Sequence, residues 1–568
     1  MRPSIIKNMF YTTIKLSLVI SGLAHGVPNK APIDLVNIFM GTNNEGASFS
    51  RGNQYPAIHV PFGMHAFSPR TSTNRTTSWF YDYDARTFTG VRMTHQPSVW
   101  AGDYSALEFM PALHSKGEHL FSYKARTDRY LSSDRSGGKE IGSPFYYRYH
   151  LPEANTLMEV TPSDHGALFR ISYPTDSSKT PYLILNGKTA RKPFRFEISQ
   201  AFKDDPYNFH GMVWSQGNSD YTNNAQNMAV FFHVVSNTPI EKVETSEDHS
   251  RAAILFKDNS DGTPVLLKLA TSYLSEEQAA QNLNSDFKAS SENTFVQARH
   301  SAKEKWEEYL DKIVIQGGKE ADRRTFYSAL YRVYAFPKKI HEPYDEATGR
   351  YHYRSPFDGR RHEGKMWVGN GFWDTYRGVW PFLTMMHPTL TGEMLDGWVS
   401  SYKQGGWTVR WSNPGYWDCM ISTHTDIIFA DAYLKGIRNW DYHSGFQASL
   451  KNALVDSPGG GRGRAGAHRY NFLGYIPWQE TGGTSEPVAR TLEHATNDFG
   501  IAQFAAALGN TNLSRYFKNR AMSYINLWDK NTRFFRPRRE GVTTDGTPIY
   551  RSKAFNPQAW RLGFTEGN

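Results

Sequence analysis

The sequence predicts a multidomain α and β protein in which an antiparallel β-sandwich precedes a toroid of helix pairs. Short strand-like runs separated by turns occupy residues 33–274, and helical patterns occupy most of the remainder. The chain has 568 residues, of which 39% are hydrophobic, so it is long enough to bury two or more cores. We therefore expect at least two domains in series.

The first 26 residues resemble a secretory signal peptide. Arg2, Lys7 and Lys15 precede an apolar run from Leu16 to Ala24, and small residues lie around Gly26. The run is too short to span a bilayer, and no later run is long and apolar enough to do so. We expect cleavage near Gly26, a secreted or periplasmic protein, and no membrane span.

The net charge and the cysteine content limit the classes of protein to which the chain could belong. The net charge of +9 is small for this length, and Lys and Arg are scattered along the chain, which excludes a nucleic-acid track. Cys419 is the only cysteine, so no intrachain disulfide can form. A secreted protein without disulfides depends on the size of its core, as many bacterial periplasmic enzymes do.

The first domain is predicted over residues 27–274. Its strand-like runs are six to eleven residues long and are divided by turn sequences such as NGK and SDG, which is typical of an antiparallel sandwich. The clearest runs are 145–151, 167–174, 182–187, 194–199, 228–235 and 264–274. The pattern becomes charged and helical near Ser275, and residues 275–318 predict two linker helices separated at Ser290–Ser291.

The second domain is predicted over residues 319–568. Helices alternate there with aromatic, Gly-rich loops, which favours an α/α toroid with functional groups on the loops; a helical bundle is the alternative. The predicted helices are Ala321–Ala335, Trp373–Met386, Gly392–Tyr402, His424–Lys435, Phe446–Leu454, Val488–Leu508 and Ser514–Leu527.

The segment from Gly371 to Pro381, GFWDTYRGVWP, predicts a sugar site. It brings Trp373, Asp374, Tyr376 and Arg377 together, and a run that extends to Gly436 adds further aromatic and charged residues: Trp407, Arg410, Trp411, Trp417, Asp418, His424 and Asp426. A sugar ring stacks its C–H patches on aromatic faces, and its hydroxyls bond to planar charged groups. A Trp-rich helical core is the alternative.

Two other clusters leave their roles open. In THQPSVWAGDY, His95 and Trp100 lie on a Pro- and Gly-containing loop, so Trp100 faces either a ligand or an interdomain core. His424, Asp426 and Asp431 surround a helix start, where they ligate a metal or act as caps and polar contacts.

Two sets of carboxylates near the end of the chain are also candidates. Glu486, Arg490, Glu493 and Asp498 form structural ion pairs or line a site. Glu566 follows an apolar turn near a Trp, a setting that raises a carboxyl pKa and suits a general acid; disorder is the alternative, since it is the third residue from the end.

Several motifs in fixed order resemble those of glycoside hydrolase family 92, the exo-acting, calcium-dependent α-mannosidases. They are VNIFMGT, YPAIHVPFGM, THQPSVWAGDY, GFWDTYR, YKQGGW with DCM and ADAYLKGI, ARTLEHATNDFGIAQFAAALG, and FTEGN. The resemblance covers Asp34 to Asn568. It implies a β-sandwich followed by an (α/α)6 barrel, and Ca2+-assisted hydrolysis of terminal α-linked mannose in glycans with inversion.

The resemblance also implies roles for individual residues. Glu566 in FTEGN corresponds to the general acid, while Trp373, Asp374 and Arg410 correspond to residues that hold the non-reducing mannose. His95 and Trp100 lie in the segment that shapes the site, and we expect both to contact substrate. Ala101 stands where many members have Cys, so the usual α-1,2 linkage preference is not carried over.

The sequence departs from the family at its end. In the family, FTEGN continues into further barrel helices and a Gly-Asn-Asp segment that supplies the catalytic base, and much of the calcium site is expected there. Inversion requires one carboxylate to protonate the leaving oxygen and a second to activate water. We therefore expect an incomplete barrel, and a 568-residue chain that is truncated, inactive and poorly soluble.

Two other functions remain open. A different α/α-barrel glycosidase or phosphorylase would hold both catalytic carboxylates within the residues present, among them Asp374, Glu480 and Glu566. A non-catalytic mannose-binding or decayed remnant would keep the aromatic loops without a base. The sequence predicts neither the linkage, nor tolerance of mannose-phosphate, nor the calcium ligands, nor the oligomeric state.

Overall fold

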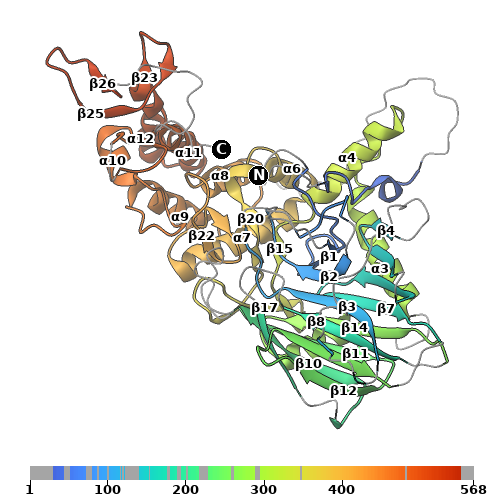
Figure 1. The fold of residues 1–568 in the computed structure, drawn as a ribbon. Helices are drawn as coiled ribbons and strands as arrows, with labels where there is room; N and C mark the ends of the chain where they lie inside the picture. Colours follow the sequence, from blue (N-terminus) through green and yellow to red (C-terminus); the bar gives the residue numbers. More distant parts are fainter. Residues whose placement is uncertain are drawn as a thin grey trace, which may run out of the picture.

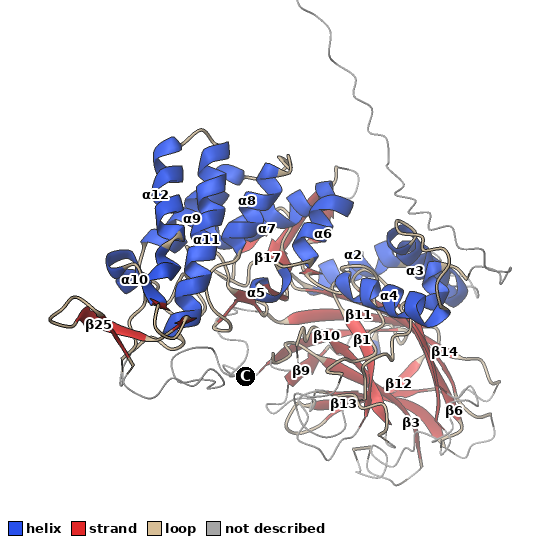
Figure 2. Cartoon of the chain, turned by 90° about the horizontal axis from the view of Figure 1, so that it is seen from above, coloured by secondary structure: helices blue, strands red, loops and turns tan. Residues whose placement is uncertain are grey.

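The computed structural model divides into a strand-rich unit and a helical unit, which lie at opposite ends of the molecule (Figures 1 and 2). Residues 1–29, Trp100, Glu480 and Glu566 lie outside the described residues, and with them the predicted signal peptide. The structure describes residues 30–43, 52–71, 80–85, 88–98, 101–115, 117, 120–121, 140–151, 154–175, 179–187, 194–199, 203–215, 228–257, 261–287, 294–345, 348–479 and 483–551.

Two antiparallel sheets build the strand-rich unit. The six-stranded sheet has the order β1 (Ala66–Thr71), β2 (Phe88–Thr94), β3 (Leu107–His114), β8 (Thr180–Asn186), β13 (Arg251–Phe256), β12 (Ile240–Thr245). The eight-stranded sheet has the order β4 (Glu140–Ser143), β5 (Tyr146–Leu151), β6 (Thr156–Pro162), β7 (Gly166–Ser172), β14 (Val265–Ser272), β11 (Val230–Ser236), β10 (Asn208–Ser215), β9 (Phe194–Ile198).

The two sheets bury a shared aromatic core. Phe169 of β7 lies 5.9 Å from Phe67 of β1 and 4.7 Å from Phe109 of β3, measured between ring centroids. Burial alternates along β11, as expected where one face of a strand meets the core and the other meets solvent. The prediction of an antiparallel strand-rich domain is confirmed.

Three helices follow β14, the last strand of the two large sheets, and lie along the sandwich beside the helical unit (Figure 2). They are α2 (Glu276–Asp286), α3 (Thr294–Leu310) and α4 (Glu320–Val333). Ser275 caps α2, because its hydroxyl accepts a 3.1 Å hydrogen bond from the Gln278 backbone N–H. On α3, Trp306 donates its indole N–H to the carbonyl of His59 at 2.6 Å, which fixes this helix to the N-terminal domain.

The helical unit is built from helices joined by short two- and three-stranded sheets. Helix α11 lies at its centre and packs against α8, α9 and α12. The helices are α5 (Phe372–Thr375), α6 (Val379–Met386), α7 (Pro388–Gly405), α8 (Thr425–Leu434), α9 (Tyr442–Leu454), α10 (Ala467–Leu473), α11 (Pro487–Ala507) and α12 (Thr511–Ala521). The strands are β15 (Lys338–Lys339), β16 (Glu342–Asp345), β17 (Arg350–Arg354), β18 (Arg361–Glu363), β19 (Trp367–Val368), β20 (Asn370–Gly371), β21 (Trp411–Ser412), β22 (Tyr416–Trp417), β23 (Trp528–Asp529), β24 (Phe534–Phe535), β25 (Arg538–Val542) and β26 (Pro548–Tyr550).

Two predicted helices differ from the structure. The helix predicted over Ser514–Leu527 ends at Ala521, and a 3-10 helix follows over Ser523–Leu527. Residues 373–386 form two helices, because α5 ends at Thr375 and the chain turns at Gly378 before α6 begins. Gly378 has φ −144° and ψ −46°, outside the helical region, so the helix is interrupted there. The break matters for the site, because it separates Trp373 and Asp374 from the apolar helix that follows.

Ion pairs and hydrogen bonds join the two units. Asp164, between β6 and β7, pairs with Lys305 of α3 and Lys339 of β15. Glu342 accepts hydrogen bonds from the Tyr273 backbone N–H at 2.8 Å and from the Asn282 amide at 2.7 Å. The linker helices are therefore attached to both domains.

His341 lies where the two units meet, and its protonation makes the free energy of unfolding depend on pH. It is buried between Tyr351 and Trp367, with ring centroids 5.2 and 5.1 Å away, and burial lowers its pKa to about 3. The unfolded chain takes up this proton below about pH 6.5, whereas the folded chain does not. Stability should therefore fall by about 1.4 kcal/mol per pH unit between pH 6.5 and 3 on account of this residue.

The variant His341→Phe tests this prediction. Between pH 6.5 and 5.0 its free energy of unfolding, measured by urea denaturation, should fall by about 2 kcal/mol less than that of the unchanged chain. The exposed His300 on α3 supplies the control His300→Gln, which should keep the original pH dependence. Equal losses in the His341 variant and the unchanged chain would contradict the assignment.

Candidate active site

The predicted sugar segment forms a compact turn in the helical unit. Trp373 and Asp374 lie in α5, directly after β20, which pairs with β21 of the β21–β22 hairpin. Gly371 begins this turn because nothing larger fits: a Cβ there would lie 2.2 Å from the Trp411 ring and 2.5 Å from Oδ2 of Asp374. The turn and the hairpin are thus in direct contact.

Asp374 is exposed on one side and held on the other. Its Oδ2 accepts a hydrogen bond from the Trp411 indole N–H at 3.2 Å. The protein atoms around the carboxyl group displace water and raise its pKa, against the opposing effects of Trp411, Arg377 and His424. A carboxylate fixed in this way can accept hydrogen bonds from ligand hydroxyls.

Trp373 is anchored to helix α11. Its indole N–H donates to Oε1 of Glu493 at 3.3 Å, and the guanidinium of Arg377 lies 4.8 Å from its ring centroid. The other oxygen of Glu493 lies 2.8 Å from Nε2 of His424, and the His424 ring stacks on Tyr376 at 4.4 Å. The aromatic groups of the turn therefore have fixed orientations.

Arg410 is buried beside the hairpin with part of its hydrogen-bonding capacity unused. One terminal nitrogen donates to the Met420 carbonyl at 3.1 Å, and the other pairs with Asp418. Only 4% of the residue is exposed. Its Nε is also buried, and it has no hydrogen-bond partner in the described part of the chain. Burial and the nearby Arg490 lower its pKa, while Asp418 raises it.

A loop of the N-terminal domain covers the hairpin. Ala101 packs against Trp411 and Trp417, whose rings meet edge to face at 5.0 Å. Asn413, at the hairpin turn, donates its amide to the Gly102 carbonyl at 3.0 Å. The site therefore lies at the interface of the two domains. Ala101, the residue that follows Trp100 in the sequence, lies against it.

His95 anchors this loop from within. Its ring is fully buried: Nδ1 donates to the Tyr104 carbonyl at 2.8 Å, and Nε2 lies 3.1 Å from the Tyr273 hydroxyl and 2.5 Å from His65. Both ring nitrogens are bound to protein groups. Its contact with substrate stays a prediction.

Asp103 completes the anchor of the loop. Its carboxylate accepts hydrogen bonds from Arg92 at 2.8 Å, from the Thr94 hydroxyl at 2.6 Å and from the His95 backbone N–H at 2.9 Å. Burial raises its pKa, but Arg92 and these hydrogen bonds outweigh that effect and hold the pKa well below its ordinary value. Asp103 is therefore an ionised hub of the loop.

A second buried network supports the helices behind the site. Arg464, with no exposed surface, donates to Asp498 at 2.6 Å, to Asp426 at 2.8 Å and to the Thr423 hydroxyl at 3.0 Å. Arg520 adds a second cation on Asp498 at 2.9 Å. The network joins α8, α11 and α12 and leaves its two carboxylates fully paired.

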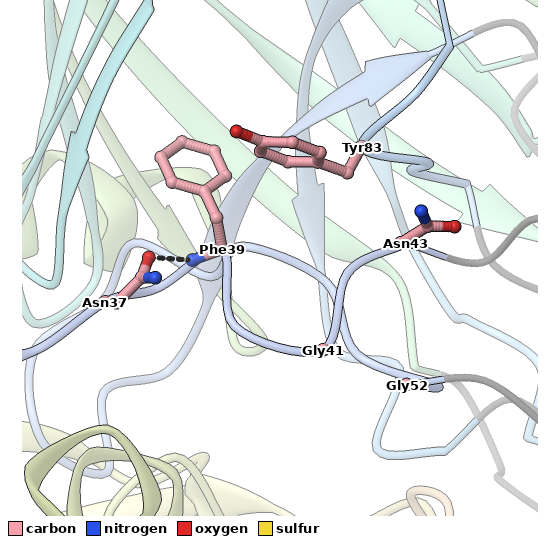
Figure 3. Close-up of a pocket in the computed structure, with 6 residues that line it drawn as sticks. All are labelled: Asn37, Phe39, Gly41, Asn43, Gly52 and Tyr83. Atoms are coloured by element: carbon pink, nitrogen blue, oxygen red, sulfur yellow. Dashed lines mark hydrogen bonds between the residues drawn. The ribbon is translucent and has the colours of Figure 1, made fainter. Parts of the chain in front are cut away.

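A separate cavity of about 490 Å³ lies in the N-terminal domain (Figure 3). It is lined by aromatic, amide and glycine residues: Asn37, Phe39, Gly41, Asn43, Gly52 and Tyr83. Asn37 already accepts from the Phe39 backbone N–H at 3.0 Å, and Asn43 donates to Asp84 at 2.5 Å. The Asn37 side-chain oxygen and the Asn43 amide nitrogen are therefore engaged with protein groups.

Comparison with models of protein families shows to which family the chain is related. The glycosyl hydrolase family 92 N-terminal domain matches residues 35–300, and the family 92 catalytic domain matches residues 278–568. The chain belongs to glycoside hydrolase family 92.

Solved structures of this family have the same fold. An inverting family 92 mannosidase of Bacteroides thetaiotaomicron is 29% identical, with a TM-score of 0.82 over 95% of this chain and 70% of its own. Another family 92 α-mannosidase of that organism is 21% identical, with a TM-score of 0.78 over the same shares, and it has also been solved with mannoimidazole.

A curated relative aligns with a smaller share of the chain. An uncharacterized secreted glycosidase of Arthroderma benhamiae is 27% identical over 286 residues, which are 48% of this chain. The chain spans 32% of the length of that relative.

Family 92 membership implies Ca2+. Within the described ranges, no group of three or more His, Cys, Asp or Glu side chains could hold a metal ion. His424 bonds to Glu493, Asp426 is paired with Arg464, and Asp431 pairs with Lys435 at 2.6 Å. The structure therefore favours the polar-contact interpretation of His424, Asp426 and Asp431 over the metal one.

The carboxylates of α11 divide between the two predicted roles. Glu486 pairs with Arg490 at 3.0 Å and Asp498 belongs to the buried network, so both are in ion pairs as predicted. Glu493 instead contacts Trp373, 120 residues earlier in the chain. No local pattern signals such a contact, and only the position of Glu493 on the helix face shared with Arg490 could have suggested it.

Proposed function

We propose that this chain forms the N-terminal domain and the sugar-binding part of the catalytic domain of a secreted exo-acting α-mannosidase. The contact between the Trp373–Asp374 turn and the Arg410–Trp417 hairpin, at the interface of the two domains, carries the proposal. The name of the Arthroderma benhamiae relative supports secretion. In the described part of the chain, no helix has the length and apolar character needed to cross a bilayer.

The groups of the site suit a mannose residue. Asp374 accepts from Trp411 through Oδ2, which leaves Oδ1 for a sugar hydroxyl. Arg410 offers its unpartnered Nε–H to a ligand oxygen, and Trp373 offers an indole face to the C–H patches of the ring. Mannosidase activity in relatives of the same fold, one of them 29% identical and inverting, supports terminal α-linked mannose as the substrate.

The catalytic roles rest on the family resemblance. We assign the general acid to Glu566 and propose that Trp100 shapes the site; both lie outside the described residues. Inversion needs a second carboxylate to activate water on the opposite face of the ring. Glu493 and Asp374 are unsuited to that role, because Glu493 is bonded through both oxygens and Asp374 faces the sugar hydroxyls.

The open barrel and the calcium requirement remain parts of the proposal. Phe472 of α10 and Phe499 of α11 are 80% and 55% exposed, and such large apolar surface supports helices that need further partners. We propose that Ca2+, when bound, helps to distort the mannose ring, and no step assigned to the described residues depends on it.

Replacing Asp374 by asparagine tests the proposed sugar site. The change removes the charge that a sugar hydroxyl bonds to, so the dissociation constant of mannoimidazole, measured by calorimetry, should rise at least tenfold. Asp431, which is paired with Lys435 away from the site, supplies the control Asp431→Asn, which should bind as the unchanged chain does. Equal affinity in the Asp374 variant would contradict the proposal.

The 568-residue chain should not release mannose from an aryl α-mannoside, with or without added Ca2+. The reason is that the resemblance assigns the base to a Gly-Asn-Asp segment, which is not in this sequence. Release of mannose by the purified chain, followed colorimetrically, would contradict this prediction. Mannoimidazole binding without release would also be the behaviour of a mannose-binding remnant, and activity of a longer chain that includes the base separates the two.

A further inference from the structure

The short helix α5 needs support from outside itself. It has only four residues, its N-cap Gly371 forms no side-chain cap hydrogen bond, and Gly378 follows it closely. A helix of one turn is not stable on its own. The direction in which Trp373 and Asp374 point must therefore come from tertiary contacts.

Glu493 provides the contact from the helical scaffold. It extends from α11, a helix of 21 residues packed between α8 and α12. Its Oε1 accepts from the Trp373 indole at 3.3 Å and lies 3.4 Å from Arg377, while its Oε2 lies 2.8 Å from His424. One carboxylate thus joins α5 and the start of α8 to the longest helix of the domain.

His424 provides the second support. Its ring is buried and stacks on Tyr376 at 4.4 Å with an interplanar angle of 17°, so the residue that directly follows α5 packs on a ring that Glu493 holds. The turn is therefore supported at Trp373 by a hydrogen bond and at Tyr376 by stacking. Both supports depend on the Glu493 carboxylate.

We propose that Glu493 is a positioning residue that holds Trp373, and through it Asp374, in the orientation required by the terminal sugar. The inference rests on the proposed function, because it concerns the same site. Burial raises the pKa of Glu493, but His424 and Arg377 outweigh that effect and keep the pKa below its ordinary value. An ionised acceptor with both oxygens engaged supports its neighbours and does not itself donate a proton to substrate.

Two variants distinguish the hydrogen-bonding role of the Glu493 side chain from the effect of its size. Glu493→Ala removes both hydrogen bonds and leaves the Trp373 indole N–H without its acceptor. Glu493→Gln keeps an oxygen that can accept from that indole, so it should rescue most of the function. The matched control is Glu304→Gln on α3, because Glu304 also pairs with a histidine, His300, at 3.2 Å but is exposed.

The experiment measures mannoimidazole affinity by calorimetry and the Trp373 indole resonance by ¹H–¹⁵N NMR, with Trp373→Phe assigning that resonance. Glu493→Ala should raise the dissociation constant about tenfold or more and shift the resonance, since a loosened support misplaces the contact groups. Glu493→Gln should raise it less than about threefold. Glu304→Gln should change neither quantity.

Each outcome decides the inference. If Glu493→Ala leaves the affinity and the resonance unchanged while the unchanged chain binds, the positioning role is overturned and the proposed function stands. If Glu493→Ala does not fold, Glu493→Gln decides, because a tenfold or larger rise in its dissociation constant would show that an acceptor oxygen at this position does not hold the site, which overturns the role. If the unchanged chain does not bind mannoimidazole, the proposed function fails and the positioning role fails with it.

Discussion

Replacing Arg410 by lysine should weaken the binding of mannoimidazole about a hundredfold. The guanidinium is buried and uses its two terminal nitrogens on the Met420 carbonyl and on Asp418, which leaves the Nε–H for a ligand. A lysine ammonium cannot reproduce this planar arrangement. The loss of the one charge-assisted hydrogen bond to the ligand, worth roughly 1.5–3 kcal/mol, accounts for an effect of up to about a hundredfold.

A surface arginine supplies the matched control. Arg438 is exposed, donates to the Ile437 carbonyl at 3.1 Å and lies 3.6 Å from the Tyr433 ring centroid. Arg438→Lys should leave the dissociation constant from calorimetry within about twofold of the original, because it touches none of the proposed sugar contacts. Similar affinities for the Arg410 variant and the unchanged chain would show that Arg410 does not bind the sugar.

Replacing Arg464 by methionine should lower the free energy of unfolding by about 3–5 kcal/mol. Arg464 has no exposed surface and donates to both Asp426 and Asp498. Methionine fills a similar volume but leaves Asp426 without a cation in a buried setting, which costs far more than the arginine contributes by packing. Burial already raises the Asp426 pKa in spite of Arg464, so loss of the cation favours its protonation.

Urea denaturation followed by circular dichroism measures this effect. The comparison is Lys435→Met, because Lys435 forms an exposed pair with Asp431 at 2.6 Å on α8. Such a pair is worth about 0.5 kcal/mol or less. A loss below about 1 kcal/mol for Arg464→Met would mean that the network does not stabilise the domain.

Periodicity in the sequence was sufficient for most of the fold. Strand alternation in β11 and the apolar spacing of α11 follow from local geometry, and both elements lie where the patterns predict them. The helix over residues 373–386 was wrong because its pattern is continuous across Gly378, where tertiary contacts favour a bend. Such a bend depends on residues far away in the chain, which periodicity does not detect.

The candidate site was predictable only where its residues are neighbours in sequence. The GFWDTYR motif revealed Trp373 and Asp374, but the role of Glu493 depends on a contact between α5 and α11. His95 shows the opposite limit: we expected it to contact substrate, whereas Tyr104 of the same segment, together with Tyr273 and His65, contacts both nitrogens of its buried ring. Neither outcome follows from residue type or spacing.

A crystal structure of this chain with mannoimidazole tests the central claim most directly. The account predicts the sugar ring at the domain interface, with one hydroxyl on Oδ1 of Asp374, the Nε–H of Arg410 on a ligand oxygen, and the indole of Trp373 against the ring. Density for the ring in another place, such as the cavity beside Phe39 and Tyr83, would contradict it.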